Sequence, residues 1–220
     1  MSALHLSDLL RRDVSSDPVI TGVTADSRKV SPGALFVALP GTAADGRAFI
    51  PQALAQGAAA VLAPTDTPDG AAPVLVTSGD VRRAYAIAAR GFYGAQPKTC
   101  VAVTGTNGKT SVATFCRQIW AGIGHKSASM GTLGVIGQKG VKTYALTGPG
   151  LTSPDAAEAA RLMAELAAKD VTHVALEASS HGIDQRRLDG VALKAAAFTN
   201  LTQDHLDYHG TMADYRSAKT

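Results

Sequence analysis

The chain has 220 residues, of which 45% are hydrophobic and 18% charged, with a formal net charge of +3. This composition is ordinary for a globular protein that buries a sizeable core. There is no basic block interleaved with aromatic residues, so nucleic-acid binding has little support. The two cysteines, Cys100 and Cys116, form no spacing motif for zinc or redox chemistry.

The N-terminus, MSALHLSDLLRRD, lacks a basic start followed by an apolar run, so it predicts no secretory signal. The uncharged stretch 48–65 contains Pro51, Gly57 and Pro64, which favour a helix, a turn and a strand over a membrane span. We therefore expect a cytoplasmic protein with reduced cysteines and no membrane insertion.

Short apolar runs alternate with helical patterns along the first half of the chain. Strands are predicted at 19–23, 35–39, 59–63 and 74–77, and helices near 49–56 and 81–90. Glycine and proline crowd the stretch GFYGAQPK, residues 91–98, which is typical of a linker. We predict two domains, 1–97 and 98–220.

The second half begins again with a strand at 100–103 and a helix at 109–121. Ser153 and Pro154 are predicted to cap and open a helix that runs to Ala168. The runs 172–179 and 192–200 are apolar enough for strands buried on both faces of a parallel sheet. This alternation predicts an α/β fold: a small N-terminal α/β lobe followed by a P-loop-type domain with a parallel sheet.

The stretch VAVTGTNGKTS, residues 101–111, predicts a phosphate-binding loop between a strand and a helix. Glycines let backbone N–H groups reach phosphates, and a helix N-terminus adds partial positive charge. Lys109 supplies a point charge, and the hydroxyl of Thr110 can bind Mg²⁺. Val103 occupies the position where the usual pattern has an earlier glycine. The candidate nucleotide-binding residues are Gly105, Thr106, Asn107, Gly108, Lys109, Thr110 and Ser111.

TGTNGKTS resembles the ATP loop of the Mur ligase superfamily, whose members lack that earlier glycine. Three further blocks resemble its MurE branch: residues 26–50 (DSRKVSPGALFVALPGTAADGRAFI), 177–187 (EASSHGIDQRR) and 198–210 (FTNLTQDHLDYHG). The resemblance extends from about Ala25 to the C-terminus. It implies an ATP- and Mg²⁺-dependent amide ligase of peptidoglycan synthesis, which adds the third amino acid to UDP-N-acetylmuramoyl-dipeptide through an acyl phosphate.

The resemblance also implies catalytic roles. Lys109 would hold the terminal phosphates, and Thr110, Glu177 and His205 would bind Mg²⁺. Lys219 aligns with a lysine that the family carbamoylates, which would make it a further metal ligand. Without the loop, a glutamate after a strand is more often a solvated residue, and a histidine is more often a surface or capping residue. We therefore expect His181 and His209 to be structural, and assign no catalytic role to Asp204 or Asp207.

Substrate contacts are implied at matched positions only. Thr152 and Ser153 stand where the family has two threonines, and Leu151 stands where some relatives have asparagine. The segment DQRR alone would indicate an exposed charged turn. The candidate residues for the UDP-muramoyl-peptide are Ala25, Ser27, Thr42, Ala43, Ala44, Thr152, Ser153, Ser179, Gln185 and Arg187.

Mur ligases carry a further C-terminal domain that holds the incoming amino acid, so we expect this chain to be an expressed fragment with an incomplete central domain. As such it should bind ligands without forming the amide bond, and the penultimate Lys219 should fray. The expected third amino acid is meso-diaminopimelate, and a monomer is favoured. Two alternatives stay open: a related ligase such as folylpolyglutamate synthetase, opposed by the N-terminal and SSHG blocks, and a non-catalytic module that binds nucleotide or UDP-sugar.

Overall fold

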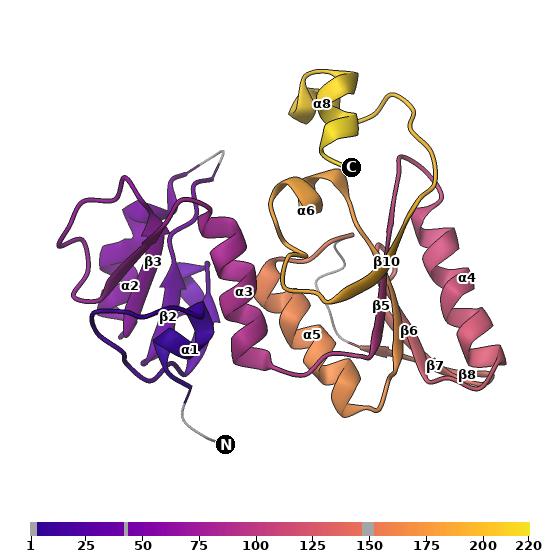
Figure 1. Ribbon diagram of the computed structural model, residues 1–220, viewed down its shortest axis with the longest axis horizontal. Helices are drawn as coiled ribbons and strands as arrows, with labels where there is room; N and C mark the ends of the chain where they lie inside the picture. The colour runs from indigo at the N-terminus through magenta and orange to yellow at the C-terminus, as the bar shows by residue number, and fades with distance from the viewer. Residues whose placement is uncertain (1–3, 42–43, 147–151) are drawn as a thin grey trace. The chain divides into compact units, whose positions relative to one another are not determined.

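A computed structural model describes residues 4–41, 44–146 and 152–220. The chain forms two compact units, Met1–Tyr93 and Gly94–Thr220 (Figure 1). The boundary falls inside the segment 91–98 that the sequence marks as a linker.

The first unit is a four-stranded parallel sheet in the order β1-β2-β3-β4. Its core includes Phe36 and Val61 from the strands, packed with Ile50 and Ala53 from the helix that follows β2. The elements are α1 (Leu6–Leu10), β1 (Gly22–Thr24), η1 (Ser27–Lys29), β2 (Ala34–Val37), η2 (Gly46–Phe49), α2 (Ile50–Ala55), β3 (Ala60–Pro64), β4 (Leu75–Ser78) and α3 (Val81–Tyr93).

The second unit contains a six-stranded sheet in the order β10-β5-β9-β6-β7-β8. The first four strands are parallel, and β7 and β8 add an antiparallel hairpin. The α/β class is confirmed, but the sheet is mixed rather than purely parallel. The elements are β5 (Thr99–Thr104), α4 (Lys109–Gly122), β6 (Ser127–Gly131), β7 (Gly134–Lys139), β8 (Lys142–Leu146), α5 (Ala156–Ala168), β9 (His173–Glu177), α6 (Ser180–Asp184), β10 (Leu193–Phe198), α7 (Leu206–His209) and α8 (Met212–Ser217).

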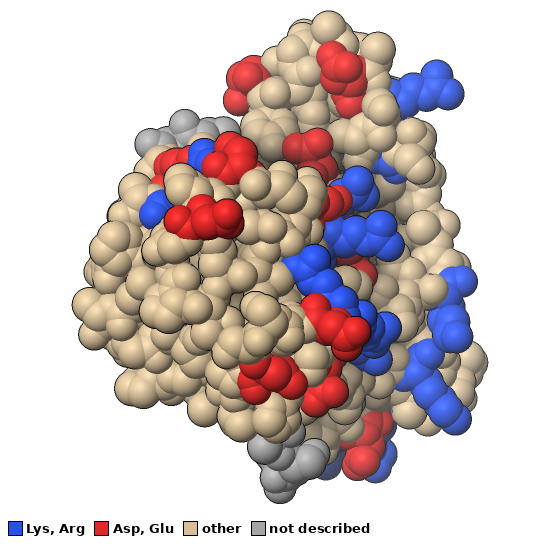
Figure 2. All heavy atoms as spheres, turned by 60° about the vertical axis from the view of Figure 1, so that its left-hand side comes forward, with Lys and Arg blue, Asp and Glu red and all other residues tan. Residues whose placement is uncertain are grey.

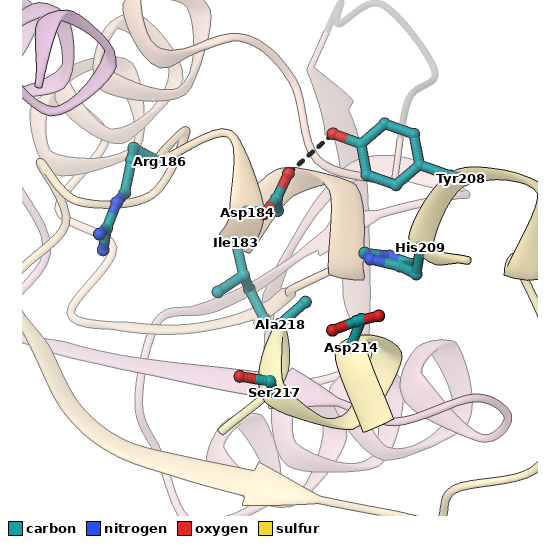
Figure 3. A pocket seen from close by; sticks show the side chains of 8 residues that line it. All are labelled: Ile183, Asp184, Arg186, Tyr208, His209, Asp214, Ser217 and Ala218. Carbon is teal, nitrogen blue, oxygen red and sulfur yellow. Dashed lines mark hydrogen bonds between the residues drawn. The ribbon is translucent and has the colours of Figure 1, made fainter. Parts of the chain in front are cut away.

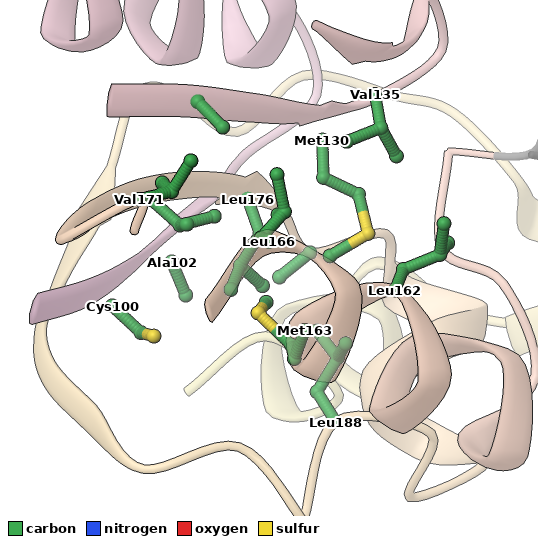
Figure 4. Packing of buried hydrophobic residues seen from close by; sticks show 13 residues of the cluster. Cys100, Ala102, Met130, Val135, Leu162, Met163, Leu166, Val171, Leu176 and Leu188 are labelled. Atoms are coloured by element: carbon green, nitrogen blue, oxygen red, sulfur yellow. The ribbon is translucent and has the colours of Figure 1, made fainter. Parts of the chain in front are cut away.

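Alternation along β5 and β9 explains why helices cover both faces of this sheet. Ala102 and Leu176 point into the core cluster that Leu162 and Leu166 of α5 complete (Figure 4). Val103 and Ala175, one residue away from these, point to the opposite face and meet Ala113 of α4. Figure 1 shows α4 and α5 on opposite sides of β5.

Two expectations about the second unit are wrong. All six residues of β10 are exposed rather than buried on both faces, and β10 is an edge strand that pairs with β5 alone among the described strands. The N-cap of α5 is Asp155, not Ser153: the Asp155 carboxylate accepts from the N–H groups of Ala157 and Glu158. The Ser153 hydroxyl instead donates to the carbonyl of Glu177 at 3.1 Å, so it is committed to the neighbouring strand.

Within the described ranges, no helix has the length and apolar character needed to cross a membrane. Figure 2 shows one face of the molecule, on which acidic and basic side chains lie interspersed among larger uncharged areas. Charge on the face in view is therefore mixed in sign.

Candidate functional site

Polar residues gather at one edge of the second sheet, where its four parallel strands end. The glycine loop 105–108 follows β5, Thr132 follows β6, Glu177 ends β9, and Thr199 follows β10. Parallel strands bring their carboxyl ends to the same edge, and open α/β sheets bind ligands there. The predicted loop and the predicted carboxylate are thus on adjacent strands, β5 and β9.

The loop has a conformation that only glycine adopts easily at two positions. Gly105 has φ 131° and Gly108 has φ 85°. A Cβ on Gly105 would also collide with the Thr199 hydroxyl. α4 then begins at Lys109, and the first N–H groups of a helix have no partners within the helix. The loop and helix start are therefore suited to an anion.

Asn200, which follows β10, holds the loop from the side. Its carbonyl accepts the Thr106 N–H at 2.9 Å, and its Oδ1 accepts the Asn107 N–H at 3.1 Å. Thr199 Oγ1 donates to the Asn107 carbonyl at 2.6 Å. Sequence reasoning missed both residues as part of the site. The signal available was a Thr-Asn pair directly after a strand, the same place where Glu177 was found.

Two lysines converge on the loop. Lys109 Nζ donates to the carbonyls of Gly105 and Thr106, each at 2.8 Å, and Lys219 Nζ donates to the Gly105 carbonyl at 3.1 Å. Lys219 is only 7% exposed and lies over the Tyr215 ring. Burial, followed by the nearby charge of Lys109, lowers the pKa of Lys219 to about 8. The expectation that Lys219 frays is wrong, because Tyr215 and the loop carbonyl fix it.

Glu177 is a buried carboxylate, 3% exposed, rather than a solvated loop residue. Thr110 Oγ1 donates to its Oε2 at 3.0 Å, and Thr132 donates its N–H to Oε1 at 3.0 Å and its hydroxyl to Oε2 at 3.2 Å. A Cβ on Gly131 would collide with the carboxylate, so glycine is needed there. Thr132 is a further site residue that the sequence did not predict, because its contact with Glu177 depends on β6 lying beside β9.

Only part of the predicted metal set is brought together. The oxygens of Thr110 and Glu177 lie side by side, and hard oxygen donors of this kind suit Mg²⁺. His205 lies instead in a cluster of rings, 5.1 Å from His181 and 6.3 Å from Tyr215 between centroids. In the described parts of the chain, no three His, Cys, Asp or Glu side chains form a metal-binding group.

The candidate substrate residues of the second unit form one hydrogen-bonded network. Ser179 Oγ donates to Ser153 Oγ at 3.1 Å, and Arg187 Nη1 donates to the Ser153 carbonyl at 2.8 Å. Arg187 also donates from Nε and Nη2 to Gln185 Oε1, at 3.2 and 2.8 Å. The Thr152 hydroxyl lies 2.9 Å from that of Thr132, which connects this network to the carboxylate of Glu177. The segment DQRR is therefore more than a solvated turn.

His181, which we expected to be structural, is the second residue of α6 and packs against aromatic rings. Its ring centroid lies 4.0 Å from that of Tyr208 and 5.6 Å from that of His209. Burial lowers the pKa of His181, and His205 and His209 lower it further. His181 is therefore favoured in its neutral form, as a ring that packs against others.

The candidate residues of the first unit are only partly described. Ser27 is 7% exposed, and its hydroxyl donates to Gln52 Oε1 at 2.9 Å. The Arg28 guanidinium beside Asp26 lowers the pKa of that carboxyl to about 2. Asp26 therefore stays ionised and paired with Arg28 in the turn around Ser27. Ala25 is partly buried and Ala44 is exposed. The predicted residues Thr42 and Ala43 lie outside the described residues.

Comparison with known families gives two matches along the chain. Residues 103–220 match the family described as the Mur ligase middle domain. Residues 19–93 match the family described as the catalytic domain of the Mur ligase family.

The chain is similar to longer curated proteins. It is 64% identical over 216 residues to a protein of Caulobacter vibrioides and 57% identical over 216 residues to one of Rhizobium meliloti. Both are named UDP-N-acetylmuramoyl-L-alanyl-D-glutamate–2,6-diaminopimelate ligase. The aligned residues are 98% of this chain but only 44% and 43% of those proteins, so the chain spans less than half of their length.

Solved structures agree on the fold. A structure titled UDP-N-acetylmuramoyl-L-alanyl-D-glutamate–2,6-diaminopimelate ligase matches with a TM-score of 0.83 at 30% identity, over 99% of this chain and 44% of that one. A MurF ligase from Thermotoga maritima in complex with ADP matches with a TM-score of 0.56 at 21% identity, over 96% of this chain and 43% of that one. The second likeness concerns the fold alone.

Proposed function

Because this chain belongs to the Mur ligase family, we propose that it supplies the ATP-binding and UDP-sugar-binding parts of a ligase of peptidoglycan precursor synthesis. The reaction is the addition of a third amino acid, meso-diaminopimelate, to UDP-N-acetylmuramoyl-L-alanyl-D-glutamate. The names of the curated relatives and the 64% identity support this choice of substrates.

Amide formation needs the carboxylate oxygen converted into a leaving group. In the proposed reaction a carboxylate oxygen of the dipeptide attacks the γ-phosphorus of ATP, and the bond from that phosphorus to ADP breaks. The amine of the incoming amino acid then attacks the acyl carbon, and inorganic phosphate leaves. Phosphoryl transfer of this kind depends mainly on positioning and charge neutralisation.

The residues around the loop fit these requirements. Lys109, now bonded to the loop carbonyls, supplies a cation for the terminal phosphates, together with the N–H groups of the helix start. Thr110 and Glu177 would hold Mg²⁺, which neutralises phosphate charge when bound. His205 and the carbamoylated form of Lys219 remain proposed ligands, on the resemblance alone.

Substrate recognition is divided between the units in this proposal. Arg187, Gln185, Ser179, Ser153 and Thr152 would contact the muramoyl-dipeptide, because a guanidinium pairs well with a carboxylate. The UDP part would lie against the first unit, at Ala25, Ser27 and the segment 42–44.

The single observation that carries the proposal is the buried Glu177 bonded to Thr110 beside the glycine loop, at the ends of adjacent parallel strands. Calorimetric titration of the chain with Mg·ATP and with UDP-N-acetylmuramoyl-L-alanyl-D-glutamate tests it. We expect both ligands to bind. Mg·ATP binding without the UDP ligand would favour the folylpolyglutamate synthetase-like alternative, and binding of neither would refute the proposal.

A further inference from the structure

We propose that Tyr208, held by Asp184, is a positioning residue for recognition of the dipeptide: it orients Gln185 and, through Gln185, the guanidinium of Arg187. This inference rests on the proposed function, which assigns Gln185 and Arg187 to the muramoyl-dipeptide. It adds two residues, from α6 and α7, that would not touch the substrate themselves.

A chain of hydrogen bonds carries the inference. The Tyr208 hydroxyl donates to Asp184 Oδ2 at 2.7 Å, as the dashed line in Figure 3 marks, and accepts from Gln185 Nε2 at 3.3 Å. Gln185 Oε1 in turn accepts from Nε and Nη2 of Arg187. The two ends of the Gln185 amide thus meet Tyr208 and Arg187, which fixes its orientation.

The donor and acceptor roles in these hydrogen bonds allow only one orientation of the Gln185 amide. Asp184 can only accept when ionised, so it turns the Tyr208 O–H toward itself and leaves a lone pair for the Gln185 NH₂ group. The Gln185 oxygen is then directed at Arg187, which has only donors. A guanidinium whose plane is fixed before binding loses little side-chain freedom when it meets a carboxylate.

The ring and the hydroxyl of Tyr208 make different contacts, so packing and hydrogen bonding can be tested separately. Tyr208 and Asp184 line an open cavity of about 560 Å³ whose other walls include His209, Asp214 and Ser217 (Figure 3). The Tyr208 ring packs against His181, with centroids 4.0 Å apart, whereas its hydroxyl serves the hydrogen-bond chain. Replacing Tyr208 by phenylalanine therefore removes the bonds and keeps the ring contact.

The test measures two affinities for each of several variants. Tyr208→Phe should weaken binding of UDP-N-acetylmuramoyl-L-alanyl-D-glutamate by about fivefold, the usual worth of one neutral hydrogen bond. It should leave the dissociation constants of Mg·ATP and of peptide-free UDP-N-acetylmuramic acid unchanged. Tyr144→Phe is the matched control, since Tyr144 lies on β8, outside this network.

Asp184 provides the rescue experiment. Asp184→Ala should weaken the dipeptide ligand as Tyr208→Phe does, and Asp184→Asn, which keeps an oxygen acceptor, should restore most of the affinity. The double variant Tyr208→Phe/Asp184→Ala should bind the dipeptide ligand no more weakly than either single variant, because both substitutions break the same series of hydrogen bonds. Additive losses, or equal losses for all three ligands, would mean a structural role and overturn the inference.

Arg187→Ala separates failure of this inference from failure of the proposed function. If Arg187→Ala weakens the dipeptide ligand and Tyr208→Phe does not, the positioning role is wrong and the substrate assignment stands. If neither variant changes the affinity, the assignment of this network to the dipeptide is itself wrong, and the inference fails with it.

Discussion

Lys109 is held by its own loop, through bonds to the carbonyls of Gly105 and Thr106. An anion bound at the helix start would share a cation that is already in place. We predict that Lys109→Ala weakens Mg·ATP binding by about 10- to 100-fold, since a charge-assisted hydrogen bond is worth about 1.5–3 kcal/mol. Calorimetry measures this, and Lys142→Ala on β8, an exposed lysine, is the control. Unchanged affinity with an intact circular dichroism spectrum would remove the phosphate-loop interpretation.

Arg187 differs from Lys109 because its partners are Ser153 and Gln185, away from the loop. Arg187→Ala should weaken binding of UDP-N-acetylmuramoyl-L-alanyl-D-glutamate by about 10- to 100-fold and leave the affinity for Mg·ATP nearly unchanged. Isothermal calorimetry with each ligand checks this. Arg161→Ala, on the surface of α5, is the matched control. Equal affinity for wild type and variant would mean that Arg187 serves only the fold.

At the scale of elements, apolar runs predicted some buried strands but not all: β6 (Ser127–Gly131) is buried along its whole length and was not predicted. β9 was predicted from the run 172–179, and its residues Val174 to Glu177 are buried between α4 and α5. β10 has a similar apolar composition yet is exposed, because exposure depends on what packs on a strand, and β10 lies at the edge of the sheet. Composition cannot reveal that place.

The β7–β8 hairpin was missed for a different reason. Its strands contain glycine, lysine and glutamine, so they lack a continuous apolar run. The usable signal was the two-residue turn Gly140-Val141, with Gly140 at φ 57°. A glycine turn between short strands indicates a hairpin even where hydrophobicity is weak.

The site was partly predictable for the same physical reasons. The loop was found because its glycines and lysine follow a strand in a recognisable pattern. Glu177 was identified only together with that loop and the family resemblance, since a glutamate at the end of a strand alone indicates a solvated residue. Thr132, Thr199 and Asn200 act through backbone geometry and through the pairing of strands distant in sequence. Such roles become visible only when the sheet order is known.

His173, the first residue of β9, stacks on His125, which lies between α4 and β6. The rings of His125 and His173 lie 4.0 Å apart, and burial, followed by the charge of His125, lowers the pKa of His173. The unfolded chain, with a histidine pKa near 6.5, then binds more protons in acid than the folded chain. The free energy of unfolding of this unit should therefore fall as the pH drops below about 6.5.

His125→Gln should reduce this acid sensitivity, because it removes one of the two causes of the lowered pKa of His173. Urea unfolding at pH 7.5 and at pH 5.5 measures it, with wild type and variant compared at both. Trp120, the single tryptophan of the chain, lies 5.3 Å from His173 and reports the transition by fluorescence. The same pH dependence in both proteins would contradict the prediction.

At the scale of the whole molecule, the proposed function assigns Mg·ATP and the muramoyl-dipeptide to the second unit and the UDP part to the first. Binding stabilises the structure that forms the site, in proportion to the logarithm of ligand concentration. Mg·ATP should therefore slow amide hydrogen exchange around 105–111 and 132. The UDP-muramoyl-dipeptide should slow exchange around 25–29 as well as around 179–187. If Mg·ATP slowed amide exchange only at residues 25–29, the proposed assignment of ligands to the two units would be wrong.

The bonds from Asn200 to Thr106 and Asn107 have a consequence for the thermodynamics of binding. A glycine loop left to itself samples many backbone states, and a ligand that selects one of them must bear that loss of entropy. In this structure the residues that follow β10 already hold the loop in one backbone conformation. Nucleotide association should therefore show little ordering entropy from the loop, and its heat capacity change should reflect the surface covered rather than a segment that folds around the ligand.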